Sequence, residues 1–288
     1  MSRYGRVPSV LLGLVGQDIG SSRTPEMQMR EAEAQGLRCV YRLIDLAALG
    51  LGVDALPDIL SSCERLGFDG INVTHPCKQA VIPHLHALSD DARALGAVNT
   101  VLFRDGRRIG HNTDWSGFAE PFRAGMAGAR LDRVVQLGAG GAGAAVAHAA
   151  LTLGAGRLTI FDIDPARADS VAANLAAHFG PGRAVAGTDR ASAMADATGL
   201  INATPIGMEA HPGLPLDAAL LRPDLWVAEV IYFPLETELL RRARALGCRT
   251  IDGGGMAVFQ AVAAFRLFAG REPNVDRMVA QFRSMDAA

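Results

Sequence analysis

The chain has 288 residues, of which 49% are hydrophobic and 20% charged, and its formal net charge is −2. This length suits two domains, and the apolar content is sufficient for two cores. The near-neutral charge argues against a basic nucleic-acid-binding surface and a polybasic membrane patch, so we expect neither kind of partner.

The cysteines are scattered singly and form no C-x-x-C pair; they are Cys39, Cys63, Cys77 and Cys248. Isolated cysteines are typical of reduced thiols, and they favour a cytoplasmic protein. No cluster of His, Cys and Asp has zinc-ligand spacing, so we expect no metal site.

Two apolar segments need an explanation other than membrane insertion. Val7–Gly16 follows two arginines, as in a short signal peptide, but it lacks a small-x-small cleavage site, so we interpret it as a buried first strand. Val134–Gly156 contains no charged residue, but glycines interrupt it after four residues. A strand, a glycine turn and a helix explain it better than a membrane span.

Strands and helices alternate in the first part of the chain. The predicted elements are strand Val10–Val15, helix Pro25–Gln35, strand Val40–Ile44, helix Asp54–Leu66 and strand Gly70–Val73. Thr24 is a candidate N-cap before Pro25, and Gly36 ends that helix. This order favours a parallel sheet with helices on its faces.

A hairpin and a second alternating pattern follow. Helix Ser89–Leu95 precedes a hairpin in which Asp105-Gly106 joins Ala97–Phe103 to Arg108–His111, and helix Trp115–Gly125 comes next. The later predictions are strands 134–137, 158–161, 201–203, 226–231 and 250–251, and helices 141–153, 165–178, 236–246 and 256–268.

The elements group into two α/β domains. We predict an N-terminal α/β/α substrate domain with a mainly parallel sheet, formed by residues 1–114 and 253–288. Residues 115–252 are predicted to form a Rossmann-type dinucleotide-binding domain. The chain therefore returns to the first domain after about Asp252.

A glycine-rich turn predicts the cofactor site. The pattern G-x-G-x-x-G is matched by Gly138, Ala139, Gly140, Gly141, Ala142 and Gly143. It follows an apolar strand and opens an alanine-rich helix, which is the context that the motif needs. The glycines allow a tight turn and close approach of a pyrophosphate to the helix N-terminus.

Asp162 favours NAD over NADP. It ends the next predicted strand, where a carboxylate accepts hydrogen bonds from ribose hydroxyls. The 2′-phosphate of NADP would meet this charge: two unit charges about 4 Å apart cost about 4 kcal/mol at an effective dielectric near 20, or roughly three decades of affinity. Asp164 adds a second anion, whereas Arg167 offers some compensation, so NADP stays the alternative.

Six ordered motifs carry a resemblance to one enzyme family. They are Ser22-Arg23-Thr24-Pro25, Asn72–Lys78, Gly96–Thr100, Asn112-Thr113-Asp114, Asn202–Met208 and Asp252–Gln260. Together they resemble the shikimate dehydrogenase family over about residues 10–270. The resemblance implies a hydride transfer between NAD and the C3 ring hydroxyl of quinate or shikimate, which gives 3-dehydroquinate or 3-dehydroshikimate.

The resemblance also implies roles for individual residues. Lys78 and Asp114 match the family's acid–base pair. A lysine has a reference pKa of about 10.4, so a partly dehydrated pocket is needed for it to act as a base near neutrality. The residues that would bind the substrate are Ser22, Thr24, Thr74, Lys78, Asn99, Asp114, Tyr232 and Gln260. Those on the nicotinamide side would be Thr204, Gly253 and Met256, although Tyr232 and Met256 suit plain packing equally well.

Three departures from the family pattern point to its NAD-dependent quinate/shikimate branch. Thr24 stands where the biosynthetic enzymes carry Ser, Met27–Arg30 replaces a His-Asn pair, and Asp162-Ile163-Asp164 replaces an Asn-Arg-Thr-like run. The alternatives are an NADP-dependent biosynthetic shikimate dehydrogenase and, more remotely, a non-catalytic dinucleotide-binding regulator. The sequence leaves the oligomeric state open, and a homodimer is one arrangement that it permits.

Overall fold

The computed structural model describes residues 8–285 and contains two compact α/β units. The described residues up to Thr113 form the first unit together with those from Gln260 onward, and Asp114–Phe259 form the second. Each unit is built on a six-stranded sheet, which confirms the predicted α/β class. Asp114 and residues 253–259, which the sequence analysis placed in the first domain, belong to the second unit.

The first sheet is mixed but mostly parallel. Its strands are β1 (Ser9–Gly16), β2 (Arg38–Asp45), β3 (Gly70–Val73), β4 (Ala87–Leu88), β5 (Thr100–Arg104) and β6 (Arg107–His111). They lie in the order β2-β1-β3-β5-β6-β4. The first three strands are mutually parallel, and the β5–β6 hairpin adds the antiparallel pairings. The Asp105-Gly106 hairpin prediction is therefore confirmed.

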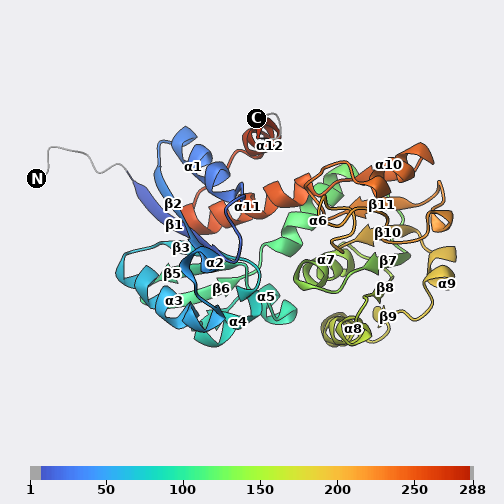
Figure 1. Cartoon of the computed structure of the whole chain (residues 1–288), viewed down its shortest axis with the longest axis horizontal. Helices are drawn as coiled ribbons and strands as arrows, with labels where there is room; N and C mark the ends of the chain where they lie inside the picture. The colour runs from blue at the N-terminus through green and yellow to red at the C-terminus, as the bar shows by residue number, and fades with distance from the viewer. Residues whose placement is uncertain (1–7, 286–288) are drawn as a thin grey trace, which may run out of the picture. The chain divides into compact units, whose positions relative to one another are not determined.

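Helices cover both faces of this sheet (Figure 1). They are α1 (Thr24–Ala34), α2 (Leu46–Leu49), α3 (Leu56–Arg65), α4 (Cys77–Ala80), α5 (Asp90–Leu95), α11 (Gly254–Ala269) and α12 (Val275–Ser284), with 3-10 turns at Val53–Ala55 and Ile82–His84. Leu56 and Leu60 of α3 pack against Ile71 on one face, and Phe268 of α11 packs against Leu12 on the other.

One predicted helix start is wrong. Arg23, not Thr24, holds the N-cap position of α1, and Thr24 is its first residue. The Arg23 backbone already has helical angles, and no side chain caps this end. The helix therefore begins one residue earlier than the Pro25 rule suggested, because proline is tolerated anywhere in the first turn.

The second unit has the strand order of a dinucleotide-binding fold. Its strands are β7 (Arg133–Leu137), β8 (Arg157–Phe161), β9 (Ala184–Ala186), β10 (Gly199–Asn202), β11 (Trp226–Glu229) and β12 (Arg249–Ile251). The order is β12-β11-β10-β7-β8-β9, and all pairings are parallel. The chain reverses direction across the sheet between β7 and β10, and ligands bind at such a switch point.

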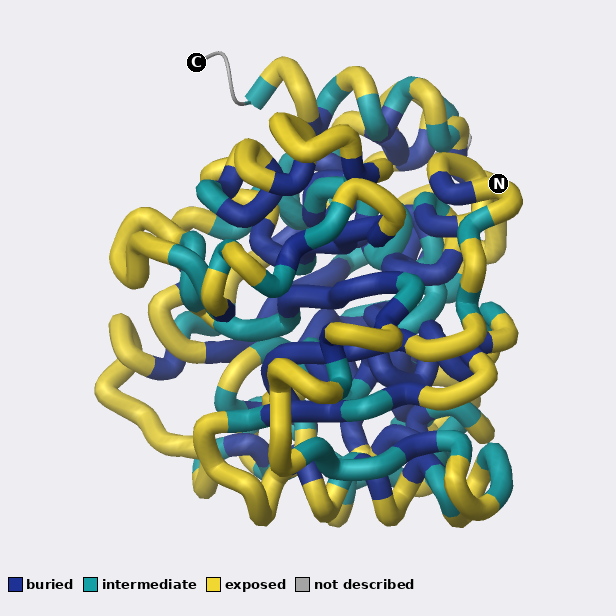
Figure 2. Tube along the Cα trace, turned by 90° about the vertical axis from the view of Figure 1, so that its right-hand side faces the viewer, coloured by how far each residue is buried: buried dark blue, intermediate teal, exposed yellow. Residues whose placement is uncertain are grey.

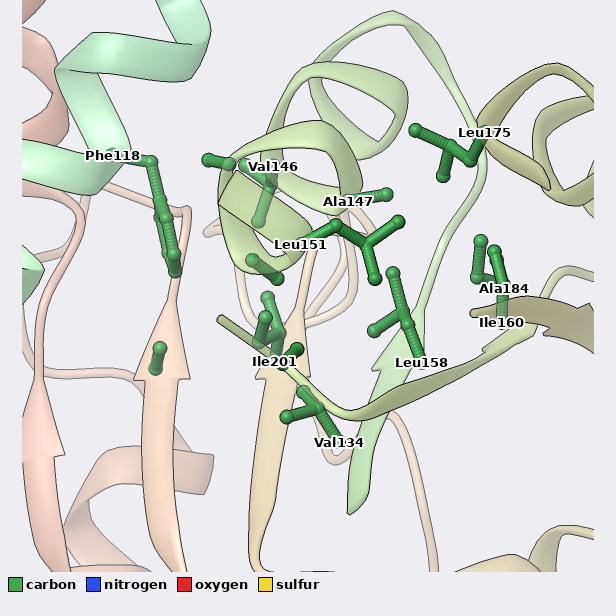
Figure 3. Close-up of a cluster of buried hydrophobic side chains, with 14 of the residues drawn as sticks. Phe118, Val134, Val146, Ala147, Leu151, Leu158, Ile160, Leu175, Ala184 and Ile201 are labelled. Carbon is green, nitrogen blue, oxygen red and sulfur yellow. The ribbon is translucent and has the colours of Figure 1, made fainter. Parts of the chain in front are cut away.

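A hydrophobic core lies on each face of this sheet, between the strands and the helices that cover it. The helices are α6 (Asp114–Gly125), α7 (Gly141–Thr152), α8 (Pro165–Phe179), α9 (Arg190–Ala195) and α10 (Glu238–Ala245), with a 3-10 turn at Ala218–Leu220. Figure 3 shows Val134 and Ile201 of adjacent strands pointing toward Val146 and Leu151 of α7. On the opposite face a separate cluster includes residues of α9 and α10.

Strands and helices differ in how far their residues are buried. Figure 2 shows buried strands, while helices alternate between buried and exposed residues along their length. Among residues 8–285, we find no helix with the length and apolar character needed to cross a membrane.

Within the first unit, a buried carboxylate joins the C-terminal helix α12 to α1. Glu31 of α1 is fully buried and accepts two hydrogen bonds from the Arg277 guanidinium of α12, each 2.7 Å long. The Asn274 N–H and the Gln35 amide also donate to it. Burial raises the pKa of Glu31, but these donors and the arginine charge outweigh it, and the net shift is downward.

We expect Arg277→Ala to destabilise the first unit by about 2 kcal/mol, since it leaves a buried carboxylate without its cation. This loss of unfolding free energy is smaller than for a fully buried ion pair because Arg277 is partly exposed. The lowered pKa means that the contribution is complete above the ordinary carboxyl pKa of 4.5 and is lost as the pH falls below it through the lowered pKa of the folded protein. Urea unfolding at a series of pH values from 7 downward to below 4 measures it. Arg283→Ala on the same helix, where the side chain is exposed, is the control; equal shifts for both variants would contradict the account.

Candidate functional site

The carboxyl ends of β1 and β3 place Thr74 and Lys78. The Thr74 N–H donates to the Val15 carbonyl at 2.9 Å, and a Cβ at Gly16 would collide with the Thr74 methyl group. Glycine at this position therefore lets the two strand ends approach closely. The chain then turns into α4, where the Cys77 N–H donates to the Thr74 carbonyl at 2.8 Å and the Lys78 carbonyl accepts from Val98.

Cys77 lies beside Lys78 in sequence but has no chemical role that the structure supports. Its side chain is buried, and burial raises the pKa of the thiol to about 11. The thiolate, which is the reactive form, is therefore scarce near neutral pH.

Asn99 fixes the backbone that leads to Asp114. Its Oδ1 accepts the Thr113 N–H at 2.8 Å, and its Nδ2 donates to Thr113 Oγ1 at 2.9 Å. Asn72, also buried, donates to the Asn99 carbonyl at 3.2 Å. These amide contacts hold the backbone at Thr113, where the first segment of the first unit ends. Asp114 follows directly as the first residue of α6.

Ser22 and Thr24 lie together at the start of α1. The Thr24 N–H points to Ser22 Oγ at 3.4 Å, so the serine partly covers an otherwise unsatisfied helix N–H. Both side chains are half-buried, as is Gln260 at the first-unit portion of α11. Gln28, in the run that departs from the family pattern, is buried and donates to the Ala261 carbonyl at 2.8 Å, which joins α1 to α11.

The glycine turn has the shape that a dinucleotide requires. A Cβ at Gly138 would lie 2.5 Å from the Ala203 carbonyl oxygen, and one at Gly143 would collide with the Gly138 carbonyl. In contrast, no atom lies within 4 Å of a Cβ built at Gly140 or Gly141. Close packing therefore requires the outer glycines, while the space in front of the inner pair fits a pyrophosphate at the N-terminus of α7.

Gln136 holds this turn from beneath. Its side chain is fully buried on β7, and Nε2 donates to the Gly138 carbonyl at 2.9 Å and to the Gly143 carbonyl at 2.8 Å. One amide group thus joins the first and last glycines of the motif. Its Oε1 is buried without a hydrogen-bond partner in the described structure.

Asp162 is attached to the same turn. Its Oδ2 accepts the Ala139 N–H at 2.7 Å and its Oδ1 accepts the Asp164 N–H at 2.9 Å. Asp164 in turn caps α8. The Arg167 guanidinium pairs with the Asp164 carboxylate at 3.5 Å and not with Asp162. The predicted ribose carboxylate is therefore held in place with a second acid beside it.

Thr204 and the backbone just before Tyr232 contact two buried polar residues of the second unit, Asn202 and Glu229. Asn202 Oδ1 accepts from the Thr204 N–H at 3.1 Å and its hydroxyl at 2.7 Å, and Asn202 Nδ2 donates to Glu229. Tyr232 follows the end of β11 and is exposed, and a Cβ at Gly253 would collide with carbonyls just before it. Met256, by contrast, is buried in the core on the α7 face.

No sequence motif predicts a role for Gln136 or Glu229, and Asn202 begins one motif without a role assigned to it. Each is a polar residue inside an apolar strand run, which is a detectable signal, because buried polar groups require specific partners. No group of three or more His, Cys, Asp or Glu side chains in the described part of the chain is arranged to hold a metal ion.

Comparisons with known proteins converge on one family. Residues 14–101 match the shikimate dehydrogenase substrate binding domain. The chain is 60% identical over 279 residues to "Shikimate dehydrogenase (NADP(+))" of Streptomyces avermitilis, covering 96% of both chains. It is 50% identical over 281 residues to "Quinate/shikimate dehydrogenase (NAD(+))" of Corynebacterium efficiens, covering 96% of this chain and 99% of that one.

A solved structure is similar over almost the whole chain. It is the quinate dehydrogenase from Corynebacterium glutamicum in complex with NAD, with a TM-score of 0.92 and 48% identity. The similarity covers 96% of this chain and 99% of that one.

We expect Gln136→Leu to weaken binding of the predicted dinucleotide about tenfold, because losing two buried hydrogen bonds of about 1 kcal/mol each loosens the turn. Calorimetric titration with NAD measures the dissociation constant. Val135→Ala, a truncation in the same strand that faces the α9–α10 core, is the control. Equal affinity losses in both variants would show that Gln136 has no special role.

Proposed function

Because the chain belongs to the shikimate dehydrogenase family, we propose that it is an NAD-dependent quinate/shikimate dehydrogenase. It would oxidise the C3 ring hydroxyl of quinate to 3-dehydroquinate and that of shikimate to 3-dehydroshikimate. When bound, NAD supplies the hydride acceptor. The chain itself would bind and orient both molecules, exclude water and move the hydroxyl proton.

The preference for NAD rests on one observation, the 2.7 Å hydrogen bond from the Ala139 N–H to the Asp162 carboxylate. This contact keeps a negative charge beside the turn that would bind the pyrophosphate. Ile163 is fully exposed and offers no cation, and Arg167 is engaged with Asp164. A 2′-phosphate would have to displace this arrangement, whereas ribose hydroxyls would donate to it.

NADP-dependent shikimate oxidation is the second candidate. The Streptomyces avermitilis relative, 60% identical, carries that name, while the Corynebacterium efficiens relative at 50% identity carries the NAD-dependent one. The overall sequence identity to these two relatives does not decide between NAD and NADP, because that choice depends on a few residues after β8.

Lys78 and Asp114 are the proposed acid–base pair. Lys78 is the only lysine in the sequence, although lysine and arginine together number 28. Every other basic side chain of this kind is an arginine, which stays protonated in proteins. The presence of a single side-chain amine, within the motif at Lys78, supports a role for this residue in proton exchange. In the oxidation direction Lys78 Nζ would take the hydroxyl proton, and Asp114 would orient the amine.

The remaining polar residues suit a polyhydroxy carboxylate. We propose that Ser22 and Thr24 bind the carboxylate, helped by the N-terminus of α1. Thr74 and Asn99 would contact ring hydroxyls, with Gln260 from α11. In the second unit, we propose Tyr232 for the substrate carboxylate, and Thr204 and Gly253 for the nicotinamide.

The first test is initial rates of reduced-nicotinamide formation, in which NAD and NADP are each combined with quinate and shikimate. We expect turnover of both substrates mainly with NAD. Shikimate turnover confined to NADP would select the second candidate. The absence of turnover in all four combinations would instead indicate the non-catalytic dinucleotide-binding alternative.

We expect Asp162→Asn to reduce the ratio of kcat/KM with NAD to that with NADP by about tenfold or more. The amide oxygen can still accept from Ala139, so the substitution isolates the charge that repels a 2′-phosphate. Asp169→Asn, which removes an exposed carboxylate from α8, is the matched control. An unchanged ratio in Asp162→Asn would contradict our account of cofactor choice.

Lys78→Met keeps the length of the side chain and removes its amine. We expect kcat to fall by roughly 10²–10⁴-fold, which is the usual contribution of general acid–base catalysis. The affinity for NAD, measured by calorimetric titration, should stay within about twofold. A parallel loss of NAD affinity would show that Lys78 supports the fold of the site rather than proton transfer.

A further inference from the structure

Glu229 is a buried carboxylate that the proposed chemistry leaves unused. It ends β11 in the second unit and is 1% exposed. Its Oε1 accepts from Asn202 Nδ2 at 3.0 Å and from the N–H groups of Val230 and Ile231 at 3.0 and 3.2 Å. Its Oε2 accepts from Asn202 Nδ2 at 3.1 Å and from Thr237 Oγ1 at 3.0 Å. All of these donors are neutral.

These contacts reach two segments that carry proposed ligand-binding residues. Asn202, held by Glu229, accepts both the N–H and the hydroxyl of Thr204. The two backbone donors to Glu229 lie immediately before Tyr232. Gly253 packs against the carbonyls of the same two residues. One carboxylate therefore joins the ends of β10 and β11, and the turn after β12 packs against the segment that it holds.

The charged groups on the elements around Glu229 are engaged elsewhere. On and before α10, Glu238 pairs with Arg241 and Arg242, and Glu236 pairs with Arg244. On and after β12, Arg249 donates to carbonyls at Gly125 and Ala127, and Asp252 accepts from the Gly254 N–H. On the loop after β10, Asp217 accepts from the Ala219 N–H, and the other titratable side chains there are Glu209 and His211. On the loop after β11, the remaining one is Tyr232.

Burial dominates the titration of Glu229. It raises the pKa of the carboxyl group to about 7, against the opposing effect of hydrogen bonds from Asn202, Ile231, Thr237 and Val230. The ionised form accepts from every donor in the cluster. A proton on Oε2 would turn that oxygen into a donor toward Thr237 Oγ1 and weaken the second contact with Asn202.

We infer that Glu229 is a positioning residue whose ionised carboxylate holds the segments of Thr204 and Tyr232 in their binding arrangement. It touches neither substrate nor cofactor in this role. The inference rests on the proposed function, because it assigns the nicotinamide and carboxylate contacts to those segments. The ionised state is the better organised one, so binding and turnover should improve as the pH rises through neutrality.

The test is the ratio of wild type to Glu229→Gln as a function of pH. The glutamine resembles the protonated carboxyl: it keeps one acceptor oxygen and places a donor where Oε2 lies. We expect kcat/KM for quinate with NAD to be about tenfold lower than wild type at pH 8.5, and the two proteins to converge at pH 6. Glu236→Gln, an exposed glutamate beyond the same strand, should track the wild type at every pH.

The affinity for NADH is measured in parallel by fluorescence titration, because it does not depend on turnover. Wild-type turnover with a ratio independent of pH would overturn the role of Glu229 and leave the proposed function standing. Absence of wild-type turnover would overturn the proposed function, and the pH dependence of the NADH affinity ratio would still decide the role of Glu229.

A second variant serves if Glu229→Gln does not fold. Thr237→Val removes one donor to the carboxylate, which disfavours its ionised form and raises its pKa further. The rise of the NADH affinity with pH, which does not involve proton transfer by Lys78, should therefore move to higher pH by about half a unit or more. An unshifted affinity profile would overturn the inference.

Discussion

The close packing of backbone at the glycine turn constrains the rest of the second unit. Gly138 lies so near Ala203 that no side chain fits between them, and its N–H donates to the Phe161 carbonyl at 2.7 Å. The Ala203 N–H donates to the Leu137 carbonyl at 2.7 Å. The ends of β7, β8 and β10 are thus joined at one point. Asp162 and Thr204, which follow two of these strands, take their positions from it.

Buried polar side chains, rather than apolar contacts, then set the details of the loops. Gln136 joins the two ends of the glycine turn, and Asn99 holds the backbone before Asp114. Apolar packing is non-directional and tolerates small shifts, whereas an amide with two or three partners has few alternative arrangements. Strand ends that must present ligands at defined positions therefore use amides where the rest of the strand uses valine and leucine.

The sequence predicted the parts of this design that depend on local patterns. The glycine turn is found because its context is short and ordered, and the Asp105-Gly106 hairpin is found because the turn residues demand it. The β-strand Ala184–Ala186 and the helix Arg190–Ala195 were missed because they are too short to show a period. The helix Val275–Ser284 was missed although Asn274 directly before it is its N-cap, and its Arg277–Glu31 contact, which joins it to a distant segment, has no local signal.

Ordered motifs give candidate site residues one at a time, but they do not give the contacts between residues. Lys78, Asp114 and Thr204 were proposed in this way, yet nothing local connects Asn202 to Glu229, which lie 27 positions apart. Their contact exists because β10 and β11 are parallel neighbours with Asn202 opposite Glu229 in the register. A parallel sheet brings such residues together only after its strand order is known, and the order follows from crossover connections rather than from the strands themselves.

The raised pKa of Glu229 means that its ionised carboxylate does not stabilise the fold near neutral pH. Its pKa of about 7 in the folded protein, against an ordinary value of 4.5, means that folding disfavours the ionised carboxylate. Below pH 4.5 there is no cost; it grows as the pH rises toward 7 and is complete above it, at about 3 kcal/mol by linkage. A neutral amide at this position would avoid that cost. The strand ends therefore carry a charge that weakens the fold near neutral pH, and the compensation lies in the firmer hold of an ionised acceptor on its donors.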